Sequence, residues 1–148
     1  MPPVPGGPSR PYEAPPHEYG PGHRGVDLPA TPGAAVVSPA AGVVTFAGPV
    51  AGRGVVVIEH EAGTRTSLEP VGASVAVGTA VAAGDVVAQV QGSPVHTGCP
   101  TARIPRCLHW GVRVDGRFVD PWWWLGVVRK VRLLPLQRGG GSPTTDQR

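Results

Sequence analysis

The chain of 148 residues has a single lysine, Lys130, only two cysteines and no long apolar run. No stretch approaches the ~18 apolar residues of a membrane-spanning helix, so no membrane span is expected. Residues 1–16 lack the basic start and the apolar run of a secretory signal. The net charge of +3 comes almost wholly from arginine, and no basic run with interleaved aromatics precedes residue 129. A nucleic-acid partner is therefore not indicated.

Apart from one segment near the end of the chain, the sequence also lacks a sustained helical pattern of apolar residues. The 22 glycines and 19 prolines favour short strands joined by turns. Strand-like runs are "HRGVDL", "AAVVSPAAGVVTFAG", "GVVVIEH", "TRTSLEPV", "ASVAV" and "DVVAQV". The Asp-Gly step of "VDGR", residues 114–117, predicts a hairpin.

One segment, "DPWWWLGVV", has a helical start, with Asp120 as a cap and Pro121 at the first position of a short turn. Trp122, Trp123 and Trp124 cannot all face one way. We expect one or two of them to cover the end of the sheet, and the alternative is a platform for a sugar or peptide.

Composition divides the chain into three parts. Residues 1–21 form a proline-rich segment that we expect to run in extended form along the domain. Residues 22–126 form one domain, and residues 127–148 form a basic, glycine-rich tail.

Two short stretches carry residue types that commonly serve as metal ligands. In "GHRGVDL", His23 and Asp27 share one face of a strand, and Gly25 between them leaves room for a third group. An imidazole nitrogen and a carboxylate oxygen are zinc donors, although a His–Asp hydrogen bond on a loop would give the same pattern. In "RCLHWGV", Cys107 and His109 point one way while Leu108 and Trp110 point the other. Taken alone, the Cys107–His109 pair fits three interpretations: a metal site, one metal ligand beside a cysteine in a disulfide, or two residues of the hydrophobic core.

The order of these motifs resembles the lysostaphin/LytM-type zinc metallopeptidases, which are peptidoglycan endopeptidases. The resemblance covers roughly residues 20–126 and rests on "GHRGVDL", "SPAAGVVTFAG", "GVVVIEH", "VAVGTAVAAGDVVAQV" and "CLHWGVRVDGRFVDP", with CLHW in place of the family's HLHW. It implies an all-β fold, a small, strongly turned hybrid sheet of the barrel-sandwich type (a duplicated hybrid motif) with glycine-rich hairpins.

The resemblance also implies a Zn²⁺ ion held by His23, Asp27 and His109. Three protein ligands leave a fourth position for water, as in catalytic zinc sites. The metal would lower the pKa of that water and polarise the scissile carbonyl. The implied function is hydrolysis of peptide cross-links in the bacterial cell wall.

Two departures from the family concern its catalytic histidines, which are replaced here by Pro70 and Cys107. Losing a general base costs roughly 10²–10⁴-fold in rate. As a replacement for a missing catalytic histidine, Glu69 is a weaker candidate than His96. It is the neighbour of Pro70 on the strand, so its side chain is expected on the opposite face from Pro70. His17 and His60 are expected at the surface. The alternative function is therefore a degenerate domain that binds wall peptides, or activates another wall hydrolase, without cutting.

Cys107 has three interpretations: a disulfide with Cys99, a free thiol, or a fourth zinc ligand that would close the site. A disulfide would draw His96, in "SPVHTGC", towards the metal. We hypothesise that His96 replaces a missing catalytic histidine; the alternative is a solvated loop residue.

Carriers with a similar hairpin offer a further function class. A biotinyl or lipoyl carrier needs a lysine at the hairpin tip, and residues 1–129 contain none. A phosphohistidine carrier would not need Asp27. The resemblance further predicts a monomer whose partner is peptidoglycan peptide, located outside the cell or in the cell wall.

Overall fold

The computed structural model describes residues 1–14, 24–61, 63–92 and 107–133, the last five without their side chains. The elements are β1 (Val26–Pro29), β2 (Ala35–Val37), β3 (Gly42–Val50), β4 (Arg53–Glu59), β5 (Thr64–Glu69), β6 (Val71–Ala73), β7 (Ala80–Val81), β8 (Val86–Val90), β9 (Cys107–Val114), β10 (Arg117–Val119) and α1 (Pro121–Leu133).

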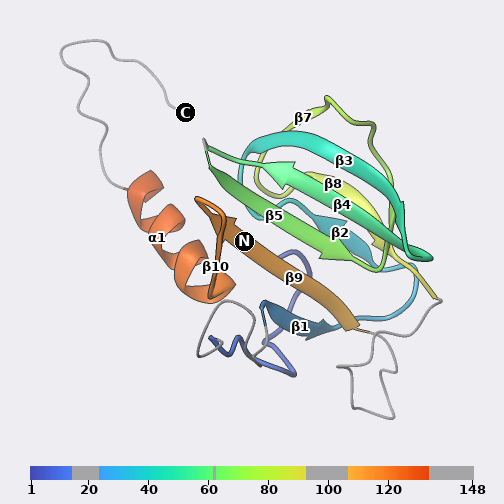
Figure 1. The fold of residues 1–148 in the computed structure, drawn as a ribbon, viewed down its shortest axis with the longest axis horizontal. Coiled ribbons are helices and arrows are strands. Elements are labelled where there is room, and N and C mark those ends of the chain that lie inside the picture. Colours follow the sequence, from blue (N-terminus) through green and yellow to red (C-terminus); the bar gives the residue numbers. More distant parts are fainter. Residues whose placement is uncertain (15–23, 62, 93–106, 134–148) are drawn as a thin grey trace.

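Two antiparallel sheets make up the described part of the domain (Figure 1). The large sheet has the order β1-β9-β5-β4-β3-β7, and β10 pairs with β9; the small sheet has the order β2-β8-β6. The expected all-β fold is confirmed in its strongly curled antiparallel sheet, and the structure adds one helix, α1, after the last strand. The late strand β9 lies between the early strands β1 and β5, so it brings together residues that are far apart in the sequence.

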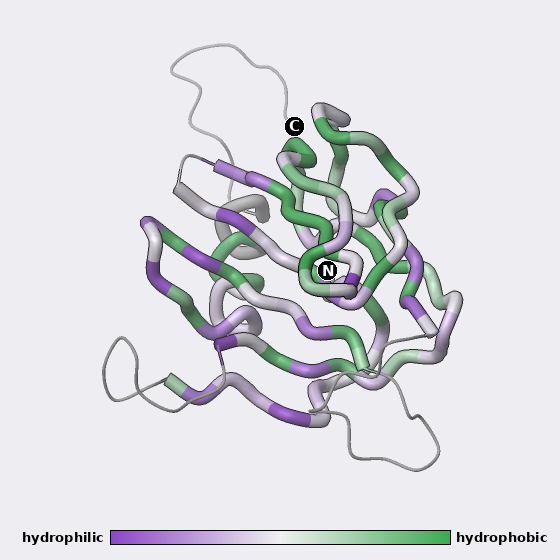
Figure 2. Tube along the Cα trace, turned by 45° about the vertical axis from the view of Figure 1, so that its right-hand side comes forward, coloured by the Kyte–Doolittle hydropathy of each residue, from purple (hydrophilic) through white to green (hydrophobic). Residues whose placement is uncertain are grey.

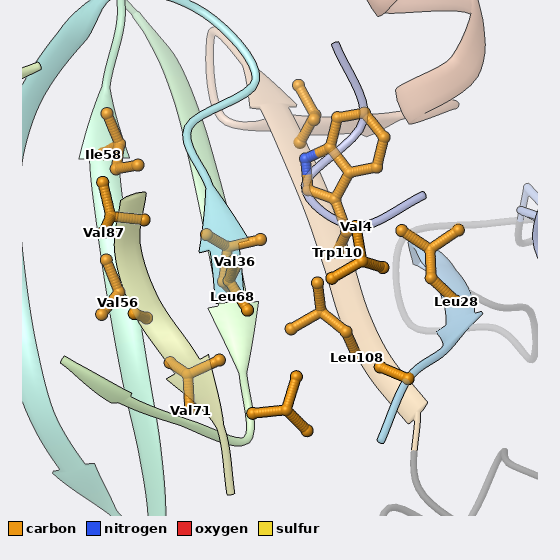
Figure 3. Packing of buried hydrophobic residues seen from close by; sticks show 14 of the residues in the cluster. Val4, Leu28, Val36, Val56, Ile58, Leu68, Val71, Val87, Leu108 and Trp110 are labelled. Carbon is orange, nitrogen blue, oxygen red and sulfur yellow. The ribbon is translucent and has the colours of Figure 1, made fainter. Parts of the chain in front are cut away.

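The core lies between the sheets and follows from alternation along the strands (Figure 2). On β9, Leu108 and Trp110 are fully buried, and the cross-strand register pairs them with Leu28 on β1 and Leu68 on β5. Figure 3 shows these side chains beside those of the small sheet, among them Val36. The other face of β9 therefore carries Cys107 and His109, as the sequence predicts.

Helix α1 begins as predicted. The backbone N–H of Trp122 donates to the Asp120 carboxylate at 2.9 Å, and Pro121 occupies the first position. The helix is longer than the expected short turn and crosses the expected boundary at residue 126. Trp122 and Trp124 pack edge-on against Trp110, with ring centroids 5.6 and 6.4 Å apart. The prediction that one or two tryptophans cover the end of the sheet is confirmed.

The predicted hairpin joins β9 to β10. Asp115 and Gly116 have φ values of 52° and 81°, the left-handed conformation that a type I′ turn requires at both central positions. No helix among the described residues is long and apolar enough to cross a membrane.

The first residues of the chain are tied to both sheets. Val4 is 2% exposed and belongs to the core, and the Pro3 carbonyl accepts from the N–H of Val37 on β2. The Tyr12 hydroxyl donates to the Phe118 carbonyl on β10. We call residues 1–13 the N-terminal strap. It runs along the domain, and it also supplies a core residue.

Candidate metal centre

The centre of the site is a pair of side chains on adjacent strands. Asp27 on β1 lies directly opposite His109 on β9, so both side chains leave the same face of the sheet. Asp27 Oδ1 is 2.9 Å from His109 Nδ1. The Asp27 side chain is fully buried and that of His109 is 17% exposed. Backbone pairing thus fixes Asp27 and His109 relative to each other, although they are 82 positions apart in the sequence. Of the two side chains, only the His109 imidazole reaches solvent.

The N-terminal strap holds the other side of Asp27. The Ser9 N–H donates to the Asp27 carbonyl at 2.7 Å, and the Asp27 N–H donates to the Arg10 carbonyl at 3.0 Å. Strand β1 therefore lies between β9 and the strap, and the main chain of Asp27 is bonded on both sides. This leaves the carboxylate little freedom to move relative to His109.

Gly25 performs the role that its spacing suggests. A Cβ atom at this position would lie 2.5 Å from the Trp110 carbonyl oxygen and 2.7 Å from His109 Nε2. The imidazole of His109 therefore packs directly over Gly25, where any larger residue would displace it. The prediction that Gly25 leaves room for a third group is confirmed.

The chemistry of the pair fits zinc. Ligand atoms of a tetrahedral zinc with bonds of about 2.1 Å are roughly 3.4 Å apart. The 2.9 Å between Asp27 Oδ1 and His109 Nδ1 is a hydrogen-bond distance, so the two atoms would move apart by about 0.5 Å to bind one zinc ion. The third predicted ligand, His23, lies outside the described residues. Within those residues no group of three His, Cys, Asp or Glu side chains forms a metal cluster. The described residues thus provide two of the three predicted ligands.

Glu69 lies where the sequence did not predict it. It stands directly opposite His109 on β5, so its side chain shares the face of His109 and Asp27. The expectation that it points to the opposite face is wrong, because β5 ends at Glu69 and Pro70 does not continue its alternation. Pro70 is buried and has no group that can transfer a proton.

Cys107 is buried on the same strand, with its sulfur 3.7 Å from the Ser9 hydroxyl. It is the one cysteine among the described residues, and it is not a free thiol. Cys99 and His96 lie outside the described residues. The Cys99–Cys107 disulfide and the role of His96 stay predictions.

His60 is more enclosed than a surface residue. Its Nδ1 is 2.9 Å from the Ala41 carbonyl and its Nε2 is 2.7 Å from the Thr66 hydroxyl. Its ring lies 5.0 Å from that of Trp124. The neutral Nδ1–H tautomer satisfies both bonds, so His60 joins β4 to the helix and β5 at the end of the sheet away from Asp27. No sequence pattern indicates these contacts, because they come from distant segments.

Comparison with known families decides the classification. The family model "Peptidase family M23" matches residues 21–121, which include the strands of both sheets and the Asp27–His109 pair. The chain belongs to peptidase family M23. The M23 domain spans most of the described residues.

Uncharacterised proteins of Mycobacterium tuberculosis and Mycobacterium bovis are 41% identical over 137 residues, 88% of this chain and 52% of theirs. The chain thus spans about half the length of these curated relatives.

Solved structures agree on the fold of this M23 domain. The catalytic domain of lysostaphin from Staphylococcus simulans matches with a TM-score of 0.64 and 21% identity, covering 80% of this chain and 90% of that one. A zinc-containing peptidase from Vibrio cholerae matches with a TM-score of 0.61 and 26% identity, covering 77% of this chain and 35% of that one. The lysostaphin-type fold that the sequence predicts is confirmed.

Proposed function

We propose that this M23 domain is a zinc-dependent endopeptidase that cuts peptide cross-links of the bacterial cell wall. The Asp27–His109 pair carries the proposal: two zinc donors face each other at 2.9 Å on paired strands, in a chain of peptidase family M23. The similarity to a zinc-containing peptidase supports the choice of metal. The site of action would be outside the cell or in the cell wall.

In this proposal His23, Asp27 and His109 hold the zinc. When bound, the metal supplies a Lewis acid and an acidified water. Asp27 and His109 are oriented by their strands, and the strap keeps Asp27 in place. The partial exposure of His109 leaves one side of the pair accessible to a peptide.

The proposal also requires groups that transfer protons during hydrolysis. Pro70 and Cys107 stand where the family has histidines, and both are buried. We propose that the Cys99–Cys107 disulfide places His96 near the metal as a substitute base. The second candidate function is a domain that binds wall peptides or activates another wall hydrolase, which the loss of both histidines favours.

Zinc content and hydrolysis, measured on one preparation, test the proposal. We would determine the zinc stoichiometry of the non-reduced protein and the chelator-sensitive release of peptides from purified peptidoglycan. One zinc per chain with chelator-sensitive release supports the endopeptidase. One zinc without release supports the binding or activator domain, and a protein that retains no zinc overturns the metal site itself.

A further inference from the structure

Helix α1 presents apolar side chains to solvent as well as to the core. Trp124 and Leu125 are buried and hold the helix on the domain. On the outward side, Trp123 is 59% exposed and Val127 is 41% exposed. They are four positions apart, so they are neighbours on one face of the helix. Together with Trp122, which is 37% exposed, they form what we call the outer stripe of α1.

Packing inside the domain does not account for the outer stripe. Trp122 and Trp124 lie edge-on against Trp110, and these contacts cover the end of the sheet. Trp123 is the most exposed of the four tryptophans of the chain. An indole ring can bury roughly 150–250 Å² of surface, most of it apolar. A cluster of large apolar side chains left exposed in this way marks an interaction surface.

The second half of α1 adds positive charge beside the outer stripe. The helix contains no acidic residue, and its later turns include Arg129, Lys130 and Arg132. Position 130 is seven residues after Trp123, so it falls on the same face of a continuous helix. Residues 121–148 hold five of the thirteen basic residues of the chain and only one of the ten acidic ones. The outer stripe is therefore followed by a basic end.

An apolar stripe followed by basic residues matches the surface of an anionic membrane. Tryptophan is enriched at the boundary between headgroups and acyl chains, where its ring meets the apolar layer and its N–H stays near water. Anionic headgroups attract lysine and arginine, and each such residue raises affinity by about fivefold. Protein interfaces, in contrast, are depleted of lysine. Lys130, at this end of α1, is the only lysine of the chain.

The position of α1 would leave the metal centre free. Figure 1 shows α1 outside the two sheets, and its tryptophans contact Trp110, which points to the core side of β9. His109 leaves the opposite face of β9. A surface that binds the outer stripe would therefore not cover the Asp27–His109 pair.

We propose that the outer stripe of α1 and its basic end dock the M23 domain on an anionic lipid surface. Trp123 and Val127 would enter the boundary between headgroups and acyl chains, and the basic residues would meet the lipid phosphates. The helix would lie on the membrane as an interfacial helix. This docking goes beyond the proposed function, because it requires neither zinc nor hydrolysis.

Binding of the full 148-residue chain to vesicles tests the proposal. The probes are vesicles of phosphatidylcholine alone and vesicles of equal parts phosphatidylglycerol and phosphatidylcholine, at low and at high salt, with chelator present throughout. Co-sedimentation should be at least about tenfold stronger with the anionic vesicles and should weaken with salt. Lipids brominated on their acyl chains should quench the tryptophan fluorescence.

Two variants assign the binding to α1. Trp123→Ala should lower the partition coefficient by at least about tenfold, because the exposed indole supplies much of the apolar area. Phe46→Ala, which removes another exposed aromatic ring on β3, is its control and should bind as the wild type does. Lys130→Gln should lower binding by about fivefold at low salt. Arg65→Gln, at an exposed position on β5, is the control for the loss of one positive charge.

Gly126 distinguishes a lipid surface from a second copy of the chain. It is exposed in the middle of α1, and nothing lies within 4 Å of its Cβ position. A fluid lipid surface accommodates one added methyl group, so Gly126→Ala should bind vesicles as the wild type does. A protein packed closely on this face would meet the methyl group. Sedimentation velocity on the wild type and on Gly126→Ala measures any self-association.

The outcomes separate the docking surface from the proposed function. Failure to bind anionic vesicles, equal binding to both kinds of vesicle, or the same loss in the control variants overturns the proposal. A dimer that dissociates in Trp123→Ala and in Gly126→Ala, without vesicle binding, also overturns it and assigns the outer stripe to a second copy. Vesicle binding by a protein that does not cut peptidoglycan supports the docking surface and contradicts only the endopeptidase.

Discussion

The carboxylate of Asp27 meets the imidazole of His109 across two strands that the chain forms 82 residues apart, with 2.9 Å between Oδ1 and Nδ1. This contact depends on backbone pairing rather than on loop conformation. It fixes two of the three predicted zinc ligands relative to each other, and their role can be tested through metal binding, stability and turnover separately.

Zinc should stabilise the protein through this pair. In the wild type, free zinc at a thousand times its Kd would add about 4 kcal/mol to the free energy of unfolding. Asp27→Asn keeps the shape and removes the charge, so the zinc-dependent rise in Tm should be lost. Calorimetric unfolding with zinc and with chelator measures this, with the exposed Glu61→Gln as control. A full zinc response in Asp27→Asn would remove Asp27 from the ligand set.

Gly25→Ala should damage the site by displacing His109. The new methyl group would overlap the Trp110 carbonyl and the imidazole, and such overpacking costs about 1–3 kcal/mol. We expect a lower Tm together with substoichiometric zinc in metal analysis. Gly72→Ala is the control, because nothing lies within 4 Å of its Cβ position. Normal zinc content in Gly25→Ala would show that His109 tolerates the shift or does not bind the metal.

Val4→Ala should show that the N-terminal strap is part of the folded domain. Val4 is 2% exposed, and losing two buried methyl groups should lower the free energy of unfolding by about 2 kcal/mol. Urea titration measures the change. Val77→Ala, at a position that is 58% exposed, should cost much less. Equal effects of the two substitutions would mean that the strap is not packed in solution.

Cys99→Ser distinguishes the interpretations of Cys107. Loss of a short-loop disulfide should lower stability by about 2–3 kcal/mol and leave zinc stoichiometry unchanged. Thiol titration of the unfolded, non-reduced wild type should find no free thiol. Two titratable thiols would exclude the disulfide, and loss of zinc in Cys107→Ser but not in Cys99→Ser would identify Cys107 as a ligand.

His96→Ala tests the substitute base. If His96 moves the proton, turnover of peptidoglycan should fall by about 10²–10⁴-fold while zinc content stays at one per chain. His17→Ala serves as the matched control for a histidine outside the described residues. Unchanged turnover in an active His96→Ala preparation would contradict the hypothesis.

The sequence determined the features that depend on neighbours along the chain. The alternation of "CLHW" placed His109 away from Leu108 and Trp110, and the Asp115–Gly116 step set the turn that follows. Asp120 and Pro121 defined where α1 begins. The spacing of Gly25 and Asp27 pointed to a site with room for a third group. Each follows from local geometry, namely strand periodicity, positive φ or helix capping, which a few adjacent residues fix.

Only the tertiary structure decided which residues face one another across strands. Glu69 opposes His109, Arg53 reaches Glu69, and Ser9 and Arg10 bond the main chain of Asp27. Alternation assigns side chains to two faces of one strand, but it cannot give the order of strands or their register. A shift of one residue would move Glu69 to the core face. Register is set by burial of the whole hydrophobic face, a property of all the paired strands together.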